Sequence, residues 1–432
     1  MPTFIRRPFR VLFCVSLISV MVAAQPQAAL SPDLQTQIAT IAREALASTG
    51  VPSASIAIVQ DGKISYLQAY GQARIDPPTP ARSDMRYSIG SISKQFTAAA
   101  ILLLAEQGKL SLDDPVSRFV PDLTRGRETT IRQILSHTSG YQDFWPQDYV
   151  PPFMLQPITA DKILDLWARK PLDFDPGTQW QYSNTNFVIA GLIVEKASGM
   201  PLLDFLSKYI FAPLNMRSVM NIDQNRLTET DPIGYLRYAL GPPRVAPKEG
   251  KGWLFAAGEL AMPAEDLAKW DISIINQTVL RPASYREMET EVVLKNGLGT
   301  RYGLGVSVRQ ESGRRAIEHG GEVSGFTAHN MVFPMNASPW SFSPTRILWT
   351  RPARSPAKLR HCCSHTTTPA SRNSNPVPSS RGCNRARSTV RCLPSMPTVT
   401  SPNKRWQTSP AAWAPSARPR SSPKPRARIV VA

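Results

Sequence analysis

The sequence predicts an α+β fold, in which an antiparallel sheet is flanked by helices and carries an inserted all-helical domain. A helical pattern at 32–48 precedes two apolar, β-branched runs at 53–60 and 63–70, and Asp61-Gly62 between them is a hairpin turn signal. Strand patterns resume only within 302–333, after a long and mostly helical stretch. Strands from both ends of the domain would therefore share one sheet.

The predicted helical block is recognised by its apolar periodicity. Its strongest segment, 91–107, contains an unbroken apolar run and ends before Gly108, a residue typical of the position just after a helix. This segment is expected to be a buried helix. Weaker helical patterns follow at 130–136, 159–168, 184–197, 202–209 and 264–275.

The net charge of +18 belongs to the ends of the chain. Residues 335–432 contain 17 Lys and Arg and no Asp or Glu, and the first ten residues contain three Arg. The remainder has 30 basic and 32 acidic residues and is close to neutral. A nucleic-acid partner is therefore not predicted for the folded body, because such partners select a basic surface.

The first 24 residues have the pattern of a signal peptide. Three Arg precede an apolar run of 13 residues at 11–23, which is too short to span a bilayer, and Val22-Ala23-Ala24 is a plausible cleavage site. A short membrane anchor is the alternative. We expect a secreted or periplasmic protein with no stable span after cleavage, and a body without disulfides, because no Cys lies between 24 and 362.

A serine and a lysine one helical turn apart form the first candidate catalytic pair. In the S-x-x-K motif of Ser91 and Lys94, positions i and i+3 share a helix face, so the amine can reach the hydroxyl. A serine hydroxyl is a poor nucleophile until a base removes its proton, and burial must lower the pKa of Lys94 for this role. The motif alone is weakly specific, since 421–424 repeats it in a Pro/Arg-rich context that does not suit a buried helix.

A second candidate motif is Tyr182-Ser183-Asn184, which leads into an apolar helix. A tyrosine hydroxyl can pass a proton between lysine, serine and a leaving group, and an asparagine amide can hold a substrate carbonyl. The alternative is that Tyr182 is a core aromatic residue with a satisfied hydroxyl.

A third candidate motif, His319-Gly320-Gly321, is expected at the end of a strand. Two glycines allow close approach of a substrate backbone to a strand edge. The strand can then offer an N–H to an oxyanion, together with the N–H of Ser91. The alternative is an ordinary hairpin turn.

Taken in order, with spacings of about 90 and 135 residues, these motifs resemble those of the penicillin-recognising serine hydrolases, the group of class C β-lactamases, DD-peptidases and esterases. The resemblance covers roughly residues 35–334 and implies the β-lactamase/transpeptidase-like fold, with no metal or cofactor. Its sheet parts would be about 31–80 and 300–334, and its helical part about 91–300. Further matching phrases are Gly90 to Thr97, Gly108 to Pro115, Leu135 to Gly140 and Tyr182 to Phe187.

The resemblance also implies a role for each residue of the first two motifs. Ser91 would be acylated, Lys94 and Tyr182 would share the acid/base work, and Asn184 would contact the substrate amide or ester. The reaction would be acyl transfer on a small-molecule or peptide substrate.

The third motif departs from the commonest family pattern. His319 stands where many relatives have Lys, which makes the substrate-binding edge formed with Gly320 and Gly321 less cationic. Glu322 follows where a small residue is usual, and would narrow the pocket or weaken the nearby oxyanion donor. His137 is interpreted as a structural loop residue.

The character of the chain changes abruptly after Pro334. Residues 335–432 are rich in Arg, Pro and Ser, whereas the family would place an apolar strand there. Back-translation of 335–345, read from the third base of the Met335 codon, allows Glu-Arg-Val-Ala-Val-Val-Val-Leu-Ala-Asn, which has that character. We therefore interpret the tail as frameshifted. The alternative is a natural disordered basic tail that binds nucleic acid or envelope polyanions.

The leading functional hypothesis is a serine hydrolase that forms an acyl-enzyme on Ser91. D-Ala-type peptides, small esters and β-lactams all remain possible substrates, because pocket shape separates them within one scaffold. The alternatives are a non-catalytic penicillin- or peptidoglycan-binding protein and a truncated, inactive hydrolase with a polyanion-binding tail.

Overall fold

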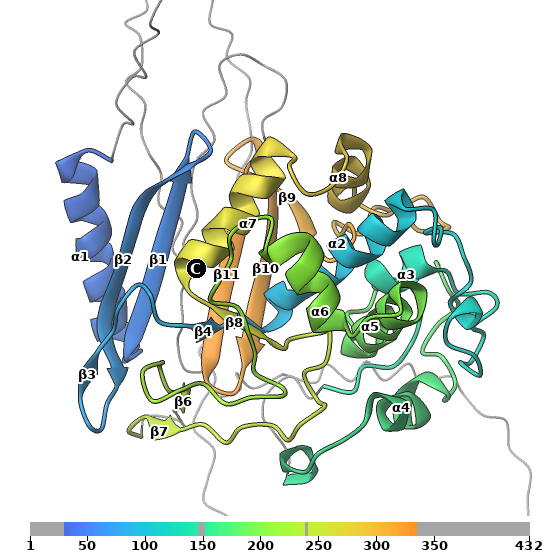
Figure 1. Ribbon diagram of the computed structural model, residues 1–432, viewed down its shortest axis with the longest axis horizontal. Helices are drawn as coiled ribbons and strands as arrows, with labels where there is room; N and C mark the ends of the chain where they lie inside the picture. The colour runs from blue at the N-terminus through green and yellow to red at the C-terminus, as the bar shows by residue number, and fades with distance from the viewer. Residues whose placement is uncertain (1–29, 146–151, 238–240, 335–432) are drawn as a thin grey trace, which may run out of the picture. The chain divides into compact units, whose positions relative to one another are not determined.

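The computed structural model of the 432-residue chain describes residues 30–145, 152–237 and 241–334. The predicted signal peptide at 1–24 and the basic tail at 335–432 lie outside these residues. The fold mixes helices and sheets, as predicted (Figure 1).

The N-terminal helix and hairpin form where the sequence predicts them. The Ser31 side chain caps the helix by accepting a hydrogen bond of 3.3 Å from Leu34 N, and Gly50 ends it in the left-handed conformation. The helix packs on the two long strands that follow, which pair antiparallel (Figure 1). These elements are α1 (Pro32–Thr49), β1 (Ser53–Gln60), β2 (Lys63–Arg74) and the short β3 (Thr79–Pro80) on the far edge of β2.

A second antiparallel sheet is built from β9 (Ser307–Glu311), β10 (Arg314–Val323) and β11 (Phe326–Val332). The predicted position of the H-G-G motif at a strand end is wrong. Gly320 and Gly321 lie within β10, because they pair with His329 and Ala328 of β11 and the strand continues to Val323.

The helical elements lie mostly where periodicity predicts them. The predicted helix at 91–107 is divided, since Gly90–Ile92 forms a 3₁₀ turn, η1, before α2 begins. The helices of this block are α2 (Ser93–Glu106), α3 (Ile131–Leu135), α4 (Ala160–Ile163), α5 (Asn184–Ser198) and α6 (Leu202–Leu206). Short 3₁₀ turns lie at Val116–Arg118 and Pro152–Leu155, and π-helical turns at Leu164–Ala168 and Ser207–Phe211 extend α4 and α6.

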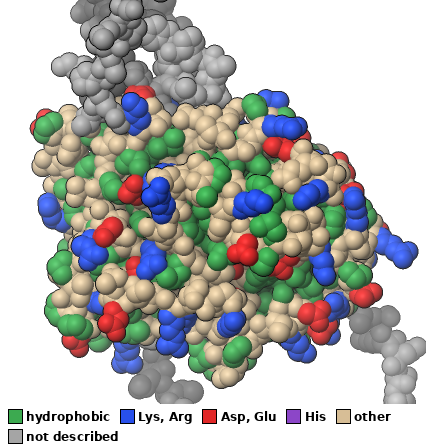
Figure 2. Space-filling model, in the orientation of Figure 1, with side chains coloured by type: hydrophobic (Ala, Val, Ile, Leu, Met, Phe, Trp, Pro, Cys, Tyr) green, Lys and Arg blue, Asp and Glu red, His purple; other side chains and the backbone are tan. Residues whose placement is uncertain are grey.

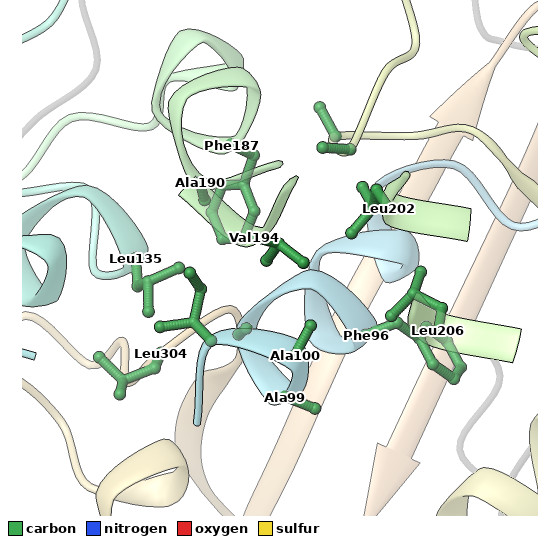
Figure 3. Close-up of a cluster of buried hydrophobic side chains, with 14 of the residues drawn as sticks. Phe96, Ala99, Ala100, Leu135, Phe187, Ala190, Val194, Leu202, Leu206 and Leu304 are labelled. Carbon is green, nitrogen blue, oxygen red and sulfur yellow. The ribbon is translucent and has the colours of Figure 1, made fainter. Parts of the chain in front are cut away.

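The main core lies between α2, α5 and their neighbours (Figure 3). Small side chains on α2, including Ala99 and Ala100, leave room for larger side chains from α5. Burial of α2 on nearly all sides makes it hydrophobic all round, which explains why its apolar run is unbroken. Core side chains labelled in Figure 3 include Phe96, Leu135, Phe187, Ala190, Val194, Leu202, Leu206 and Leu304.

Within the described residues, no single helix is long and apolar enough to cross a membrane. The bent combination of α5 with Leu202–Phe211 meets the same length and composition test, although most of α5 is buried in the core.

The segment predicted to be helical at about 91–300 also contains short strands, which corrects the expectation of an all-helical insertion. Strand β8 (Leu260–Met262) pairs on one side with β4 (Tyr87–Ser88), which precedes this segment, and on the other with β5 (Met220–Asn221). Strand β6 (Tyr235–Leu236) pairs with β7 (Arg244–Val245). Two to three residues are too few to show a period in the sequence. Helices α7 (Ala264–Asn276) and α8 (Pro282–Glu289) follow these short strands.

The described strands do not form the single sheet that the sequence predicts. β1–β3 form one three-stranded sheet and β9–β11 another, and no ladder between described residues joins them. Helix α7 contacts β1, β2 and β11, so the two sheets share a helical layer (Figure 1).

On the face shown in Figure 2, basic and acidic side chains are interspersed, without a large area of one sign. This distribution agrees with the nearly balanced charge of the chain between its two basic ends.

Candidate active site

The S-x-x-K pair meets at the start of α2. Ser91 lies in η1 and Lys94 in the first turn of α2, and Lys94 Nζ donates a hydrogen bond of 3.0 Å to Ser91 Oγ. Gly90 has a φ of +51°, a left-handed value that favours glycine at this tight entry into the helix. The backbone thus presents the serine beside an amine that can accept its proton.

Lys94 is fully buried and is held by three oxygen atoms. Besides Ser91, its Nζ donates to Asn184 Oδ1 and to the carbonyl oxygen of Ala257, both at 2.7 Å. Burial lowers the pKa of Lys94 to about 7, and the negative charge of Asp143 opposes this effect. A substantial share of the lysine is therefore a neutral base at neutral pH.

Tyr182 lies just before α5, beside the serine and the lysine. Lys94 Nζ is 5.0 Å from the centroid of its ring. Burial raises the pKa of Tyr182 above its ordinary value, and a hydrogen bond with the Ser91 side chain opposes the rise. Tyr182 is thus a protonated phenol beside the Ser91 hydroxyl.

The ring of His137 packs against the ring of Tyr182. The two rings are 4.3 Å apart between centroids, and His137 Nδ1 accepts a hydrogen bond of 3.2 Å from Ser183 N. Burial lowers the pKa of His137 well below its ordinary value, with a further contribution from Lys94, so the ring is neutral. These contacts agree with the interpretation of His137 as a structural loop residue. The structure adds that its ring packs directly against Tyr182 of the candidate site.

Asn184 connects Lys94 to Asp143, a half-buried carboxylate that no sequence motif singled out. While its Oδ1 accepts from Lys94, its Nδ2 donates to Asp143 Oδ1 at 3.1 Å and its backbone N donates to the same oxygen at 2.8 Å. These contacts fix which way the amide points. In this structure the side chain of Asn184 therefore contacts the lysine and Asp143.

The H-G-G strand passes close to Ser91. A Cβ at Gly321 would lie 1.9 Å from the carbonyl oxygen of Ile89 and 3.2 Å from Ser91 N, so only glycine fits there. A Cβ at Gly90 would lie 2.6 Å from Glu322 N. A Cβ added at Gly320 would have no neighbour within 4 Å. The close packing of β10 on η1 therefore requires glycine at position 321 and does not require it at position 320.

His319 is buried, and both of its ring nitrogens form hydrogen bonds. Its Nε2 lies 2.8 Å from the Tyr302 hydroxyl and its Nδ1 lies 2.5 Å from the Gly320 carbonyl oxygen. Nδ1 therefore carries the proton, and Nε2 accepts from the phenol. Burial lowers the pKa of His319 to about 3, with a contribution from the charge of Lys94, so this edge carries a neutral imidazole at neutral pH.

The structure therefore brings all three predicted motifs together. Three neighbours of the site were missed: Asp143, Tyr302 and the backbone carbonyl of Ala257. None lies in a motif with characteristic spacing. The phrase from Leu135 to Gly140 was the nearest available signal, since Asp143 follows it by three residues.

The fold and the site define a class: a serine activated by a buried lysine, beside a tyrosine and a glycine-containing strand, is the arrangement of β-lactamase-fold serine hydrolases. Comparison with family models leads to the same class. Residues 38–341 match the model described as Beta-lactamase, and the chain belongs to this family.

Two curated relatives are named as a penicillin-binding protein and a D-aminopeptidase. The chain is 27% identical over 288 residues to penicillin-binding protein 4* of Bacillus subtilis (strain 168), covering 63% of each chain. It is 28% identical over 279 residues to the D-aminopeptidase of Brucella anthropi, covering 64% of this chain and 52% of the relative. The chain thus spans about half to two thirds of the length of these curated relatives.

Solved structures share the fold. A D-stereospecific amidohydrolase from Streptomyces sp. is 28% identical, with a TM-score of 0.61 over 72% of this chain and 94% of that chain. The octameric penicillin-binding protein homologue from Pyrococcus abyssi is 26% identical, with a TM-score of 0.62 over 74% of each chain.

Proposed function

We propose that this protein is a serine hydrolase that cleaves esters or amides of small D-amino-acid-type compounds through an acyl-enzyme on Ser91. One observation carries the proposal: Lys94 Nζ lies 3.0 Å from Ser91 Oγ in a buried environment that lowers the pKa of the lysine to about 7. A base with this pKa is matched to proton transfer near neutral pH.

In the proposed acylation step, neutral Lys94 takes the proton of Ser91 while Oγ bonds to the substrate carbonyl carbon. The resulting tetrahedral oxyanion collapses and the bond to the leaving group breaks. Tyr182 gives its proton to that group and regains one from protonated Lys94, which returns the lysine to its neutral form. The raised pKa of Tyr182 supports a role as a proton relay and leaves the base role to Lys94. Water then hydrolyses the ester on Ser91 and releases the acid.

The proposed oxyanion site is formed by the backbone N–H groups of Ser91 and Glu322. The close approach of β10 to η1 at Gly90 and Gly321 supports this pairing. Backbone donors are held in place before the reaction, so they stabilise developing charge without reorganisation.

Neutral substrates are favoured over carboxylate-bearing ones in this proposal. The position that carries Lys in many relatives is occupied by His319, which is neutral at neutral pH. This residue offers a substrate carboxylate no cationic partner. We therefore rank small esters and amides above β-lactams and D-Ala peptides, and the names D-aminopeptidase and D-stereospecific amidohydrolase among the relatives agree with that order.

Intact mass spectrometry tests the proposal. A D-amino acid ester should add one acyl group that disappears within minutes, and Ser91→Ala should show no adduct. A fluorescent penicillin that labels Ser91 permanently, without turnover of any ester or amide, would instead identify a non-catalytic penicillin-binding protein. Absence of any adduct would refute the acyl-enzyme.

We also propose that residues 1–24 direct export of the protein, which then acts in the periplasm or outside the cell.

We propose in addition that a frameshift near Pro334 replaced the natural C-terminal segment. The high Arg, Pro and Ser content of 335–432, which contains no Asp or Glu, and the apolar peptide in the alternative frame support the frameshift. Resequencing the gene tests it, and an unaltered reading frame through this region would refute it. The chain with the alternative frame is called the restored chain below.

A further inference from the structure

A cluster of four aromatic rings connects Tyr182 with the protein surface. The ring of His137 contacts Tyr182, with 4.3 Å between ring centroids, and also contacts Trp180, with 6.2 Å between centroids. Tyr302 completes the cluster, because its ring lies 4.9 Å from that of His137 and 5.8 Å from that of Trp180. These four residues are called the aromatic cluster below.

The aromatic cluster is buried at its centre and exposed at Trp180. His137 is fully buried and Tyr302 is 3% exposed, whereas Trp180 is 40% exposed. A single exposed apolar side chain is ordinary by itself. Among the exposed large apolar side chains of the described residues, however, only Trp180 forms ring contacts with this cluster. Its exposed surface is therefore continuous with the candidate active site.

His137 also holds the backbone that carries Trp180 and Tyr182. Its carbonyl oxygen accepts a hydrogen bond of 3.0 Å from Gln181 N, and its Nδ1 accepts one of 3.2 Å from Ser183 N. The residues immediately before and after Tyr182 are thus bound to a single residue, and both flanking rings pack on its imidazole. The indole of Trp180 is therefore held in a defined position relative to the phenol of Tyr182.

No member of the aromatic cluster carries a charge at neutral pH. Burial lowers the pKa of His137 well below its ordinary value and raises the pKa of both Tyr182 and Tyr302. His319, which accepts a hydrogen bond from the Tyr302 hydroxyl, is neutral as well. The cluster therefore offers an anionic group no cationic partner, whereas it offers an uncharged ring a surface for stacking.

The position of this surface relates it to the leaving group. Because Tyr182 is the proposed proton donor to the leaving group, that group must lie beside its hydroxyl. We propose that Trp180, positioned by His137 and Tyr302, forms a subsite for an aromatic leaving group, so that the preferred substrates are arylalkyl esters or amides such as benzyl esters. This inference rests on the proposed function and names the leaving group of that reaction.

The test compares two esters of D-alanine, using the full 432-residue chain. Benzyl alcohol and cyclohexylmethanol are similar in size and acidity, so the ratio of kcat/KM for their esters reports recognition of the ring. The benzyl ester should be preferred by about three- to tenfold. Trp180→Ala should remove this preference by lowering kcat/KM for the benzyl ester, and Trp180→Phe should retain most of it.

Ile75→Ala is the matched control, because Ile75 is also 40% exposed and lies between β2 and β3, outside the aromatic cluster. The ratio should not change in this variant. A loss of equal size for both esters in Trp180→Ala would overturn the proposal, by showing that Trp180 only supports the position of Tyr182. A preference for a choline ester over its uncharged 3,3-dimethylbutyl analogue that Trp180→Ala removes would also overturn it, by identifying an ammonium site.

Binding to Ser91→Ala separates this inference from the proposed function. In calorimetric titrations, this variant should bind the benzyl ester more tightly than the cyclohexylmethyl ester. The double variant Ser91→Ala/Trp180→Ala should bind the two esters equally. Failure of both esters to acylate Ser91 would refute the proposed function, and the binding selectivity would still decide the subsite. Equal binding of the two esters by Ser91→Ala would overturn the aromatic subsite.

Discussion

Replacing Asp143 by Asn should shift the acidic limb of the pH–rate profile to lower pH. Asp143 contacts Asn184 at 3.1 Å, and Asn184 contacts Lys94 Nζ at 2.7 Å, so the carboxylate lies about 6 Å from the ammonium. At an effective dielectric constant of about 20, this pair interacts by about 3 kcal/mol, equivalent to about two pH units. Removing the negative charge removes that stabilisation of protonated Lys94.

The sign follows from the role of Lys94 as a base. With a pKa of about 7, acylation should increase as pH rises through 7 and level off above it. In Asp143→Asn the limb should move down by about one to two pH units, with a gain of no more than about twofold at pH 7, where roughly half of the lysine is already neutral. The introduced amide retains an oxygen that can accept from Asn184, so the orientation of the Asn184 side chain is preserved.

The measurement is the rate of Ser91 acylation by a chromogenic ester between about pH 5 and 9, using the restored chain. Asp113→Asn is the matched control, because Asp113 is exposed, pairs with Arg132 and does not contribute to the pKa of Lys94. A limb that stays in place in Asp143→Asn, or moves to higher pH, would refute the electrostatic argument.

Three further changes test other parts of the site. Tyr182→Phe should lower kcat by about 10²–10⁴-fold with little change in the melting temperature, because it removes only the relay hydroxyl; unaltered turnover would exclude the relay. Gly321→Ala should lower both acylation and melting temperature, since its Cβ would lie 1.9 Å from Ile89 O, whereas Gly320→Ala should leave the melting temperature unchanged. Burial and the charge of Asp223 raise the pKa of Glu259 to about 8, so its contribution to stability is present below pH 4.5 and is lost as pH rises through 8. Glu259→Gln should therefore increase stability above pH 8, by on the order of 1 kcal/mol in denaturant titrations, and equal stability of both proteins at about pH 9 would contradict this.

Local patterns were sufficient for much of the fold. Ser31, Pro32 and Gly50 mark the ends of α1, and Asp61-Gly62 marks the turn between β1 and β2, because caps and turns depend on neighbours in the chain. The short strands β5–β8 were missed, because strands of two or three residues show no period in the sequence and β5 and β8 also depend on partners distant in the chain.

The candidate site was predicted only in part for a related reason. S-x-x-K is readable because the i, i+3 geometry of one helical turn joins its two members. Asp143 and Tyr302 lie in loops. They reach the site only because Asp143 contacts Asn184 at the start of α5 and Tyr302 contacts His319 of β10.

The sequence by itself was sufficient to predict the candidate nucleophile Ser91, the candidate base Lys94, the order of the motifs and the change of composition after Pro334. These are properties of residue types at short separations. Only the tertiary structure decided that Lys94 is buried deeply enough for its pKa to be about 7, that His319 is neutral, and that β1–β3 and β9–β11 form separate ladders among the described residues. Desolvation and strand pairing depend on atoms brought together from distant parts of the chain, and no local pattern records them.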